Sequence, residues 1–292
     1  MLTTILATAL LATAPADGAL ASAPSPADVL GQLEQAHRAL FDRIAPGVVF
    51  LRTRDGFGSG FFVSERGHIL TNRHVVAGTD VVDVVAFDGT KYRGSVVDRG
   101  EHDLDLAIVK IDARDTHALT IGSSRNVDVG TWVGSVGHGR GGIWTLSTGA
   151  VSNAYGDADE GVLQTQIPLN PGASGGPVFD RHGRVVAVVT AGIADAQAMN
   201  FAIRTDTAVA GLPYLRSLTD CLVVDAPAGA KVFVDGVLFG TRREHALLLR
   251  PGRHEVTAVV RGRRLRRTVD FPADRRVSFA DTTVTSKRSP RR

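Results

Sequence analysis

The segment Pro171–Pro177 reads Pro-Gly-Ala-Ser-Gly-Gly-Pro and places Ser174 among glycines. A nucleophilic serine needs an exposed hydroxyl, and backbone N–H groups must converge where negative charge develops on the substrate. Glycine permits the backbone angles and the close approach that this arrangement requires. Ser174 is therefore a candidate nucleophile, although the motif by itself is also consistent with a glycine-rich turn that carries an incidental serine.

A serine nucleophile needs a base, and upstream candidates follow the order that such chemistry uses. His74 lies in Leu70–Val76, and Asp105 begins an apolar run; the gaps from His74 to Asp105 and from Asp105 to Ser174 are 31 and 69 residues. A carboxylate beside buried strand residues is costly unless it is paired, and accepting the imidazole Nδ1–H would pair it and fix the tautomer. We expect His74 and Asp105 on one β-barrel and Ser174 on the next, meeting in the cleft between them.

The same serine also fits the G-x-S-x-G elbow of α/β-hydrolases, which would make the chain an esterase. That fold needs a strand, a turn and a helix here, with the acid and the histidine after the serine. No helical pattern follows Ser174; Pro177 and a strand-like run at Val185–Val189 do. The order of elements disfavours this alternative.

The elements that must position these residues are short strands. Apolar or alternating runs are separated by Gly, Asp and Asn, which is typical of an antiparallel sandwich or barrel. The clearest runs are Val48–Arg52, Gly60–Val63, Val81–Phe87, Ala107–Ile111, Thr131–Val136 and Val185–Val189. Long amphipathic helices between strands are absent, which disfavours a doubly wound α/β fold, so we expect an all-β fold.

The N-terminus reads as an export signal. Leu2–Ala14 is apolar but short for a membrane span, and Ala19-Leu20-Ala21 is a small-x-small cleavage site, although Met1–Thr4 lacks Lys and Arg. A helix is expected next, with Ser25 as N-cap and Pro26 at its first position. The single cysteine, Cys221, excludes an intramolecular disulfide. The histidines other than His74 show no paired spacing with Cys or carboxylates, so no metal or other cofactor is expected.

The motifs together resemble the HtrA/Deg family of bacterial trypsin-like proteases over about residues 47–205. The matching stretches are Gly58–Val63, Ile69–Val76, Asp105–Lys110, Gln164–Gln166, Asn170–Pro177 and Asn200–Ile203. The family pattern falls on Asp105 and not on Asp103. The resemblance implies a two-barrel chymotrypsin/trypsin-like fold, followed in this chain by a second, small β-sandwich domain. It also implies a catalytic triad of His74, Asp105 and Ser174, with an oxyanion hole formed by the backbone N–H groups of Gly172 and Ser174. Ala173 stands where the family commonly has Asn.

The resemblance also suggests where substrate side chains bind. Pro168 lies where trypsin-like enzymes can carry a charged specificity residue, so selectivity for Lys or Arg is not expected. We predict an apolar primary pocket for small or medium aliphatic side chains, formed by Pro168, Leu169, Thr190, Ala191 and Gly192.

The C-terminal part differs in charge and motif. Residues 221–292 carry 16 Lys and Arg against 7 Asp and Glu, whereas residues 1–220 carry 17 against 23. Asp225–Gly240 and Leu249–Val256 resemble a PEGA domain, a small β-sandwich, with Ala228 in place of the name-giving Glu. The run Arg261–Arg267 could bind anionic envelope polymers or lipid headgroups, or could be a solvated hairpin face. No aromatic residues that could stack on bases alternate with these basic residues, so no nucleic acid partner is expected.

These patterns predict the following organisation: a signal peptide at 1–21, an N-terminal segment with a helix at 22–46, a trypsin-like domain at 47–204, a linker at 205–220, a PEGA-like domain at 221–280 and a disordered basic tail at 281–292. The predicted function is that of an exported serine endopeptidase of the bacterial periplasm or envelope that cleaves polypeptides. The alternative is an envelope binding or scaffold protein with a latent or inactive protease domain. The sequence leaves the physiological substrate and the oligomeric state open.

Overall fold

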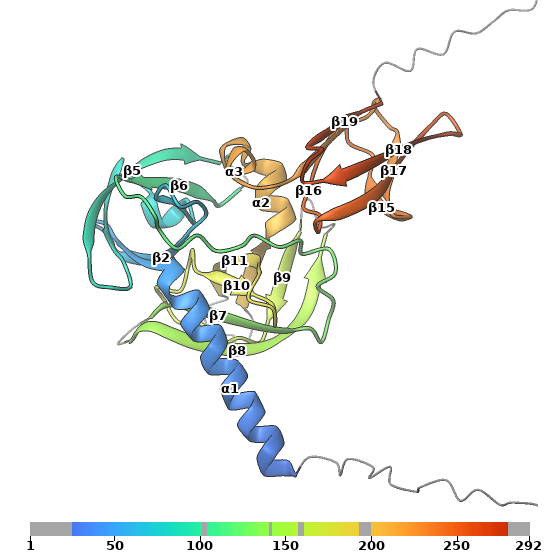
Figure 1. Ribbon diagram of the computed structural model, residues 1–292. Helices are drawn as coiled ribbons and strands as arrows, with labels where there is room; N and C mark the ends of the chain where they lie inside the picture. Colours follow the sequence, from blue (N-terminus) through green and yellow to red (C-terminus); the bar gives the residue numbers. More distant parts are fainter. Residues whose placement is uncertain (1–24, 101–103, 140–141, 157–160, 193–199, 280–292) are drawn as a thin grey trace, which may run out of the picture. The chain divides into compact units, whose positions relative to one another are not determined.

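The computed structural model describes residues 25–100, 104–139, 142–156, 161–192 and 200–279 (Figure 1). The signal peptide predicted at 1–21, the tail predicted at 281–292 and Asp103 lie outside these residues. In the described part of the chain, no helix is both long and apolar enough to cross a membrane.

Two closed antiparallel barrels account for most of the described strands (Figure 1). The first has the order β1-β2-β3-β6-β5-β4 and comprises β1 (Val48–Arg52), β2 (Phe57–Phe62), β3 (His68–Thr71), β4 (Val81–Val85), β5 (Lys91–Arg99) and β6 (Ala107–Ile111). The second has the order β10-β11-β12-β9-β8-β7 and comprises β7 (Trp132–Gly139), β8 (Gly142–Tyr155), β9 (Val162–Thr165), β10 (Pro177–Phe179), β11 (Val185–Gly192) and β12 (Asn200–Arg204). The all-β, two-barrel fold class is confirmed.

Four strands of the first barrel, β1, β2, β3 and β6, are largely buried on both faces. Neighbouring residues on a strand point to opposite sides of the sheet. Val49 and Phe62 belong to a cluster with other residues of the first barrel, whereas Val48 and Phe61 belong to a cluster that also contains Val136 and other residues of the second barrel. One face thus fills the barrel and the other joins the two barrels, which explains the continuous apolar runs in the sequence.

Helix α1 (Pro26–Ile44) has the predicted start. The Ser25 hydroxyl accepts a hydrogen bond of 3.2 Å from the Asp28 backbone N–H, and the Asp28 carboxylate accepts one of 3.0 Å from the Ser25 N–H. This reciprocal pair satisfies N–H groups that the helix itself leaves without partners.

Two short helices follow the second barrel, α2 (Thr205–Gly211) and α3 (Pro213–Leu218). Both lie in the segment 205–220, for which the sequence predicts a linker. After these come a three-stranded sheet, order β16-β13-β19, and a four-stranded sheet, order β15-β14-β17-β18. Their strands are β13 (Leu222–Asp225), β14 (Lys231–Val234), β15 (Val237–Gly240), β16 (Glu244–Leu247), β17 (Gly252–Val260), β18 (Arg263–Phe271) and β19 (Arg276–Ser278). Side chains of both sheets, such as Val224 and Val232, share one apolar cluster, so the two sheets form a sandwich.

Candidate active site

Strand pairing in the first barrel brings His74 and Asp105 together. β3 and β6 are antiparallel with Thr71 opposite Ala107. His74 therefore follows the end of β3, in a 3₁₀ turn, at the edge where Asp105 precedes β6. The Asn72 side chain reinforces this edge by donating a hydrogen bond of 2.8 Å to the Asp105 carbonyl.

The Asp105 carboxylate accepts three hydrogen bonds. The His74 side chain donates from Nδ1 to Oδ2 over 2.7 Å, and the His74 backbone N–H donates to Oδ1 over 3.0 Å. The Thr190 hydroxyl donates to Oδ2 over 2.7 Å. Burial alone would raise the pKa of Asp105, but these hydrogen bonds outweigh it and lower the pKa below its usual value. Asp105 is thus held as a carboxylate, with the Nδ1–H tautomer of His74 fixed and Nε2 free to act as a base.

Ser174 lies in the turn before β10. Pairing of β10 with β11 places Pro177 opposite Val188, so the turn lies beside the far end of β11. There the Ser174 hydroxyl donates to the Thr190 carbonyl over 3.1 Å. The Ser174 carbonyl accepts from the Ser59 N–H of the first barrel over 2.8 Å, which ties the turn across the cleft.

Two backbone donors beside Ser174 are available to a ligand. Among the hydrogen bonds of the described residues, none has Gly172 N–H or Ser174 N–H as its donor. Gly172 has φ of +103°, and a Cβ there would collide with the Phe57 ring. Only glycine fits this position, and with Pro171 before it the turn has the pattern of type II. The two N–H groups can stabilise an oxyanion.

Pro168 and Leu169, which are predicted to form part of the substrate pocket, line a cavity in the structure. The cavity has a volume of about 260 Å³ and is also lined by Asn170, Ala173 and residues of β7 and β8. Thr190 does not line this cavity, and the side-chain environments of Ala191 and Gly192 lie outside the described part of the structure. Thr190 contacts Asp105 through its hydroxyl and Ser174 through its carbonyl.

The sequence analysis missed the contact of Thr190 with Asp105. A hydroxyl residue near the end of a strand that follows the nucleophile loop is a weak signal, because such residues are common. Among the described residues, no group of three His, Cys, Asp or Glu could hold a metal ion.

Comparisons with known proteins agree with this geometry. The family model for the trypsin-like peptidase domain matches residues 58–188. The chain is 38% identical over 161 residues to a putative serine protease, HhoB, of Synechocystis sp., covering 52% of this chain and 38% of that protein. It is 31% identical over 205 residues to a probable periplasmic DegP-like serine endoprotease of Halomonas elongata, covering 61% of this chain and 43% of that protein. The chain thus spans about two fifths of the length of these curated relatives.

Solved structures extend the similarity. The crystal structure of Deg5 is 32% identical, with a TM-score of 0.55, and the match covers 63% of this chain and 95% of that one. The HtrA-type protease AlgW with a decapeptide is 21% identical, with a TM-score of 0.55, and the match covers 80% of this chain and 97% of that one. At that identity the second likeness shows the fold alone.

Proposed function

Because the chain belongs to the HtrA/Deg family of trypsin-like proteases, we propose that it is a serine endopeptidase with His74, Asp105 and Ser174 as its catalytic triad. The observation that carries the proposal is the hydrogen bond of 2.7 Å between His74 Nδ1 and Asp105 Oδ2. It leaves His74 Nε2 available as the base, and Thr190, which contacts both Asp105 and Ser174, links the acid to the serine.

The proposed reaction follows from these atoms. The Ser174 hydroxyl rotates away from the Thr190 carbonyl, gives its proton to His74 Nε2, and attacks the scissile carbonyl through Oγ. The Gly172 and Ser174 N–H groups stabilise the oxyanion, and Asp105 stabilises the imidazolium. His74 then protonates the leaving amine, and a water molecule activated by His74 hydrolyses the acyl-enzyme.

We propose unfolded or envelope polypeptides as substrates and export to the periplasm as the location. The support is the name of the Halomonas relative as a probable periplasmic serine endoprotease, together with the export signal expected at 1–21. For the primary pocket we propose preference for small or medium aliphatic side chains, since Pro168 and Leu169 bring no charge to it. Cleavage of a peptide library chiefly after Arg would contradict this preference.

The first experiment is proteolysis of unfolded casein by the mature protein, beside a Ser174→Ala variant. Loss of the nucleophile is expected to lower kcat by about 10⁶-fold. Cleavage that disappears in the variant supports the proposal. No cleavage by either protein favours the scaffold alternative, and cleavage by both means that Ser174 is not the nucleophile.

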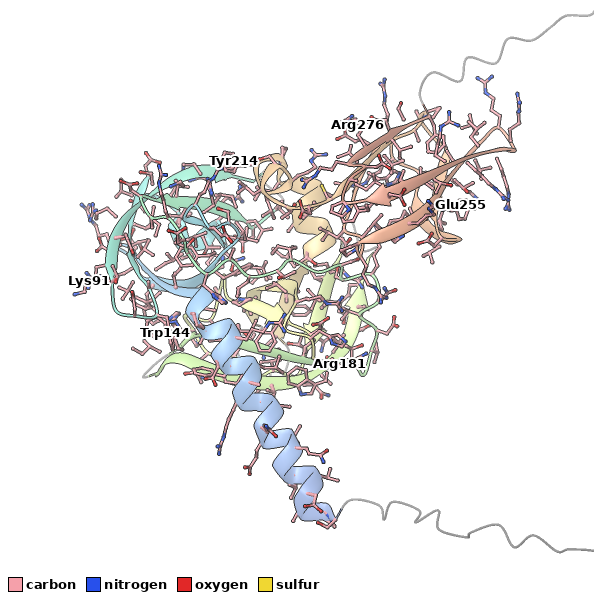
Figure 2. The ribbon with its side chains drawn as sticks, in the orientation of Figure 1. Lys91, Trp144, Arg181, Tyr214, Glu255 and Arg276 are labelled. Carbon is pink, nitrogen blue, oxygen red and sulfur yellow. The ribbon has the colours of Figure 1, made fainter. Side chains whose placement is uncertain are left out.

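For the C-terminal part we propose a PEGA-like module at 221–280, after a protease domain at 47–204 and a linker at 205–220. The support is the two-sheet sandwich and its motifs. We also propose that this module binds an anionic envelope surface. Between residues 221 and 279 the sequence has twelve Lys and Arg against six Asp and Glu, and Figure 2 shows nitrogen-tipped side chains projecting from the β17–β18 hairpin.

The register of the four-stranded sheet indicates which cations share a face. Lys231 lies opposite Val259, and Val259 lies opposite Arg264, so Lys231 and Arg264 flank one residue of β17 on the same side of the sheet. Both are exposed. The ion pairs found among the described residues include Arg253 with Asp270 and Arg266 with Glu255 on this face, but neither Lys231 nor Arg264.

The test uses the full chain with Ser174→Ala, titrated at two salt concentrations against phosphatidylglycerol vesicles, phosphatidylcholine vesicles and poly(glycerol phosphate). Salt-sensitive binding to the anionic forms, weakened by Lys231→Gln with Arg264→Gln, supports the proposal. The matched control replaces Arg52 and Arg93, which pair with Asp83 on the first barrel. Binding to the vesicles only, or to the polymer only, identifies which of the two carries the anion that is bound. Absence of binding, or an equal loss of binding in the control variant, would contradict the proposal that this module binds an anionic surface.

A further inference from the structure

A buried hydroxyl of the first barrel contacts the loop that carries the oxyanion donors. Ser59 of β2 donates from Oγ to the Gly172 carbonyl over 2.8 Å. The same oxygen accepts a hydrogen bond of 3.0 Å from the His138 backbone N–H of β7. Ser59 and His138 are both fully buried. Ser59 thus links β2 of the first barrel to β7 of the second barrel and to Gly172, two residues before Ser174.

The His138 side chain completes this contact. Its Nδ1 lies 3.1 Å from Ser59 Oγ. Since the single hydroxyl proton of Ser59 points to the Gly172 carbonyl, Nδ1 carries the proton and donates to Ser59 Oγ. His138 Nε2 is buried without a hydrogen-bond partner. Burial lowers the pKa of His138 to about 4, so the ring is neutral at ordinary pH.

Packing restricts the position of both residues. The His138 ring lies edge-on against Phe50, with centroids 5.2 Å apart, and against Trp144, with centroids 4.8 Å apart (Trp144 is labelled in Figure 2). Phe50 in turn packs on Phe57, with centroids 5.7 Å apart. The Phe57 ring occupies the space on which a Gly172 side chain would intrude. Gly172 is therefore held by a hydrogen bond at its carbonyl and by a ring against its Cα.

We infer that Ser59 and His138 are positioning residues, which hold Gly172 so that its N–H points to the substrate oxyanion; this inference rests on the proposed function. The Gly172 N–H lies in the peptide plane before its Cα, and the Gly172 carbonyl lies in the plane after it. The backbone angles of Gly172, including its φ of +103°, set the orientation of one plane relative to the other. The Ser59 hydroxyl fixes one plane, and the Ala173 N–H, bonded to the Asn170 carbonyl over 3.0 Å, fixes the far side of the same peptide. Oxyanion stabilisation requires donors held in place before the reaction, so loss of this support weakens the transition state more than the ground state.

The test compares Ser59→Ala, His138→Leu and His138→Asn with the wild type on a chromogenic peptide. Asn can donate from nearly the position of Nδ1, whereas Leu has similar bulk and no donor. The matched control is Thr165→Val, at a buried threonine of β9 whose hydroxyl has no hydrogen-bond partner among the described residues. Rates are normalised to the active-site count from the end point of fluorophosphonate labelling, so that unfolded protein does not enter kcat.

We expect Ser59→Ala and His138→Leu to lower kcat by about 10- to 100-fold, below the full effect of deleting an oxyanion donor, with KM within about twofold. The affinity for a peptidyl trifluoromethyl ketone, which forms an oxyanion on Ser174, should fall by the same factor, while a product peptide binds unchanged. His138→Asn should keep most of the activity, and Thr165→Val should resemble the wild type.

Three results would overturn the inference in different ways. If the wild type cleaves and Ser59→Ala keeps its kcat and its ketone affinity, the positioning role is wrong and the proposed function stands. If the wild type neither cleaves nor takes up the fluorophosphonate, the proposed function fails and the inference falls with it. Equal losses in Thr165→Val would also contradict it, because the effect would then be general to buried hydroxyl residues of the second barrel.

Discussion

The Thr190 hydroxyl donates a hydrogen bond of 2.7 Å to the carboxylate of Asp105. The two residues belong to different barrels, and the Thr190 carbonyl also accepts from Ser174. One residue of β11 therefore contacts both the acid and the nucleophile of the proposed triad. Its hydroxyl stabilises the charged form of Asp105, and its carbonyl holds the Ser174 hydroxyl until it turns to His74.

Replacing Thr190 tests the hydroxyl contact. We expect Thr190→Val to lower kcat by about tenfold, because a hydrogen bond to a charged group contributes about 1.5–3 kcal/mol. The pKa of Asp105 should rise, so the acid limb of the kcat profile should move to higher pH. Thr190→Ser keeps the hydroxyl and should stay near the wild type. An unchanged profile in Thr190→Val would contradict a role for this contact.

Replacing Asp105 tests the orientation of His74. Asp105→Asn keeps the shape of the side chain but offers His74 Nδ1 a different partner, which favours the wrong imidazole tautomer, and kcat should fall by about 10⁴-fold. The control is Asp83→Asn, an exposed carboxylate paired with Arg52 and Arg93. Peptide hydrolysis gives kcat, and circular dichroism checks the fold. A loss below about tenfold in Asp105→Asn would count against the proposed triad.

Asp206 of α2 offers a test of stability rather than catalysis. This buried carboxylate accepts hydrogen bonds from the Ser123 hydroxyl and from the Ser124 N–H and hydroxyl, and it lies 3.5 Å from Arg125. Asp206→Ala leaves these buried donors without their acceptor and should lower the free energy of unfolding by about 3 kcal/mol.

The measurement is urea unfolding in a Ser174→Ala background, which removes self-cleavage. Asp83→Ala is the control, because its ion pairs are solvent-exposed and should contribute far less. If Asp206→Ala lowers the free energy of unfolding no more than the control does, the cost of burying the carboxylate would equal the stabilisation from its hydrogen bonds.

His138 should make stability depend on pH in the acid range. Its pKa is lowered from the usual 6.5 to about 4 in the folded protein by burial, so between these values the unfolded chain binds more protons than the folded chain. The free energy of unfolding then rises with pH; the contribution is complete above 6.5 and is lost as the pH falls toward 4. The difference corresponds to on the order of 3 kcal/mol.

The measurement is urea unfolding of Ser174→Ala at pH 7, 5.5 and 4, with and without His138→Asn. The Asn variant should lose less stability on acidification, because that side chain does not titrate. Parallel curves for the two proteins would show that His138 is not the residue responsible.

Much of the fold could be predicted from strand patterns. The runs at Val48–Arg52 and Ala107–Ile111 coincide with β1 and β6, because nearly all their residues are apolar and become buried when the strand joins the barrel. The expected run Val81–Phe87 ends early, at Val85 in β4, and β11 extends past Val189 to Gly192. Strand ends depend on which neighbours continue the hydrogen-bond ladder, and this is not encoded in the strand's own residues.

The sequence by itself determined the types and order of the chemical groups: a serine among glycines, and a histidine and an aspartate upstream. It also indicated an antiparallel barrel or sandwich, because many short strands follow one another without long helices between them. These are local properties of residue type and spacing. Only the tertiary structure decided that Thr190 contacts Asp105 and that Ser59 contacts Gly172, since each contact joins residues from different barrels. Such contacts depend on how the two barrels pack, which is set by the apolar interface that contains Phe61 and Val136, and no local pattern specifies that geometry.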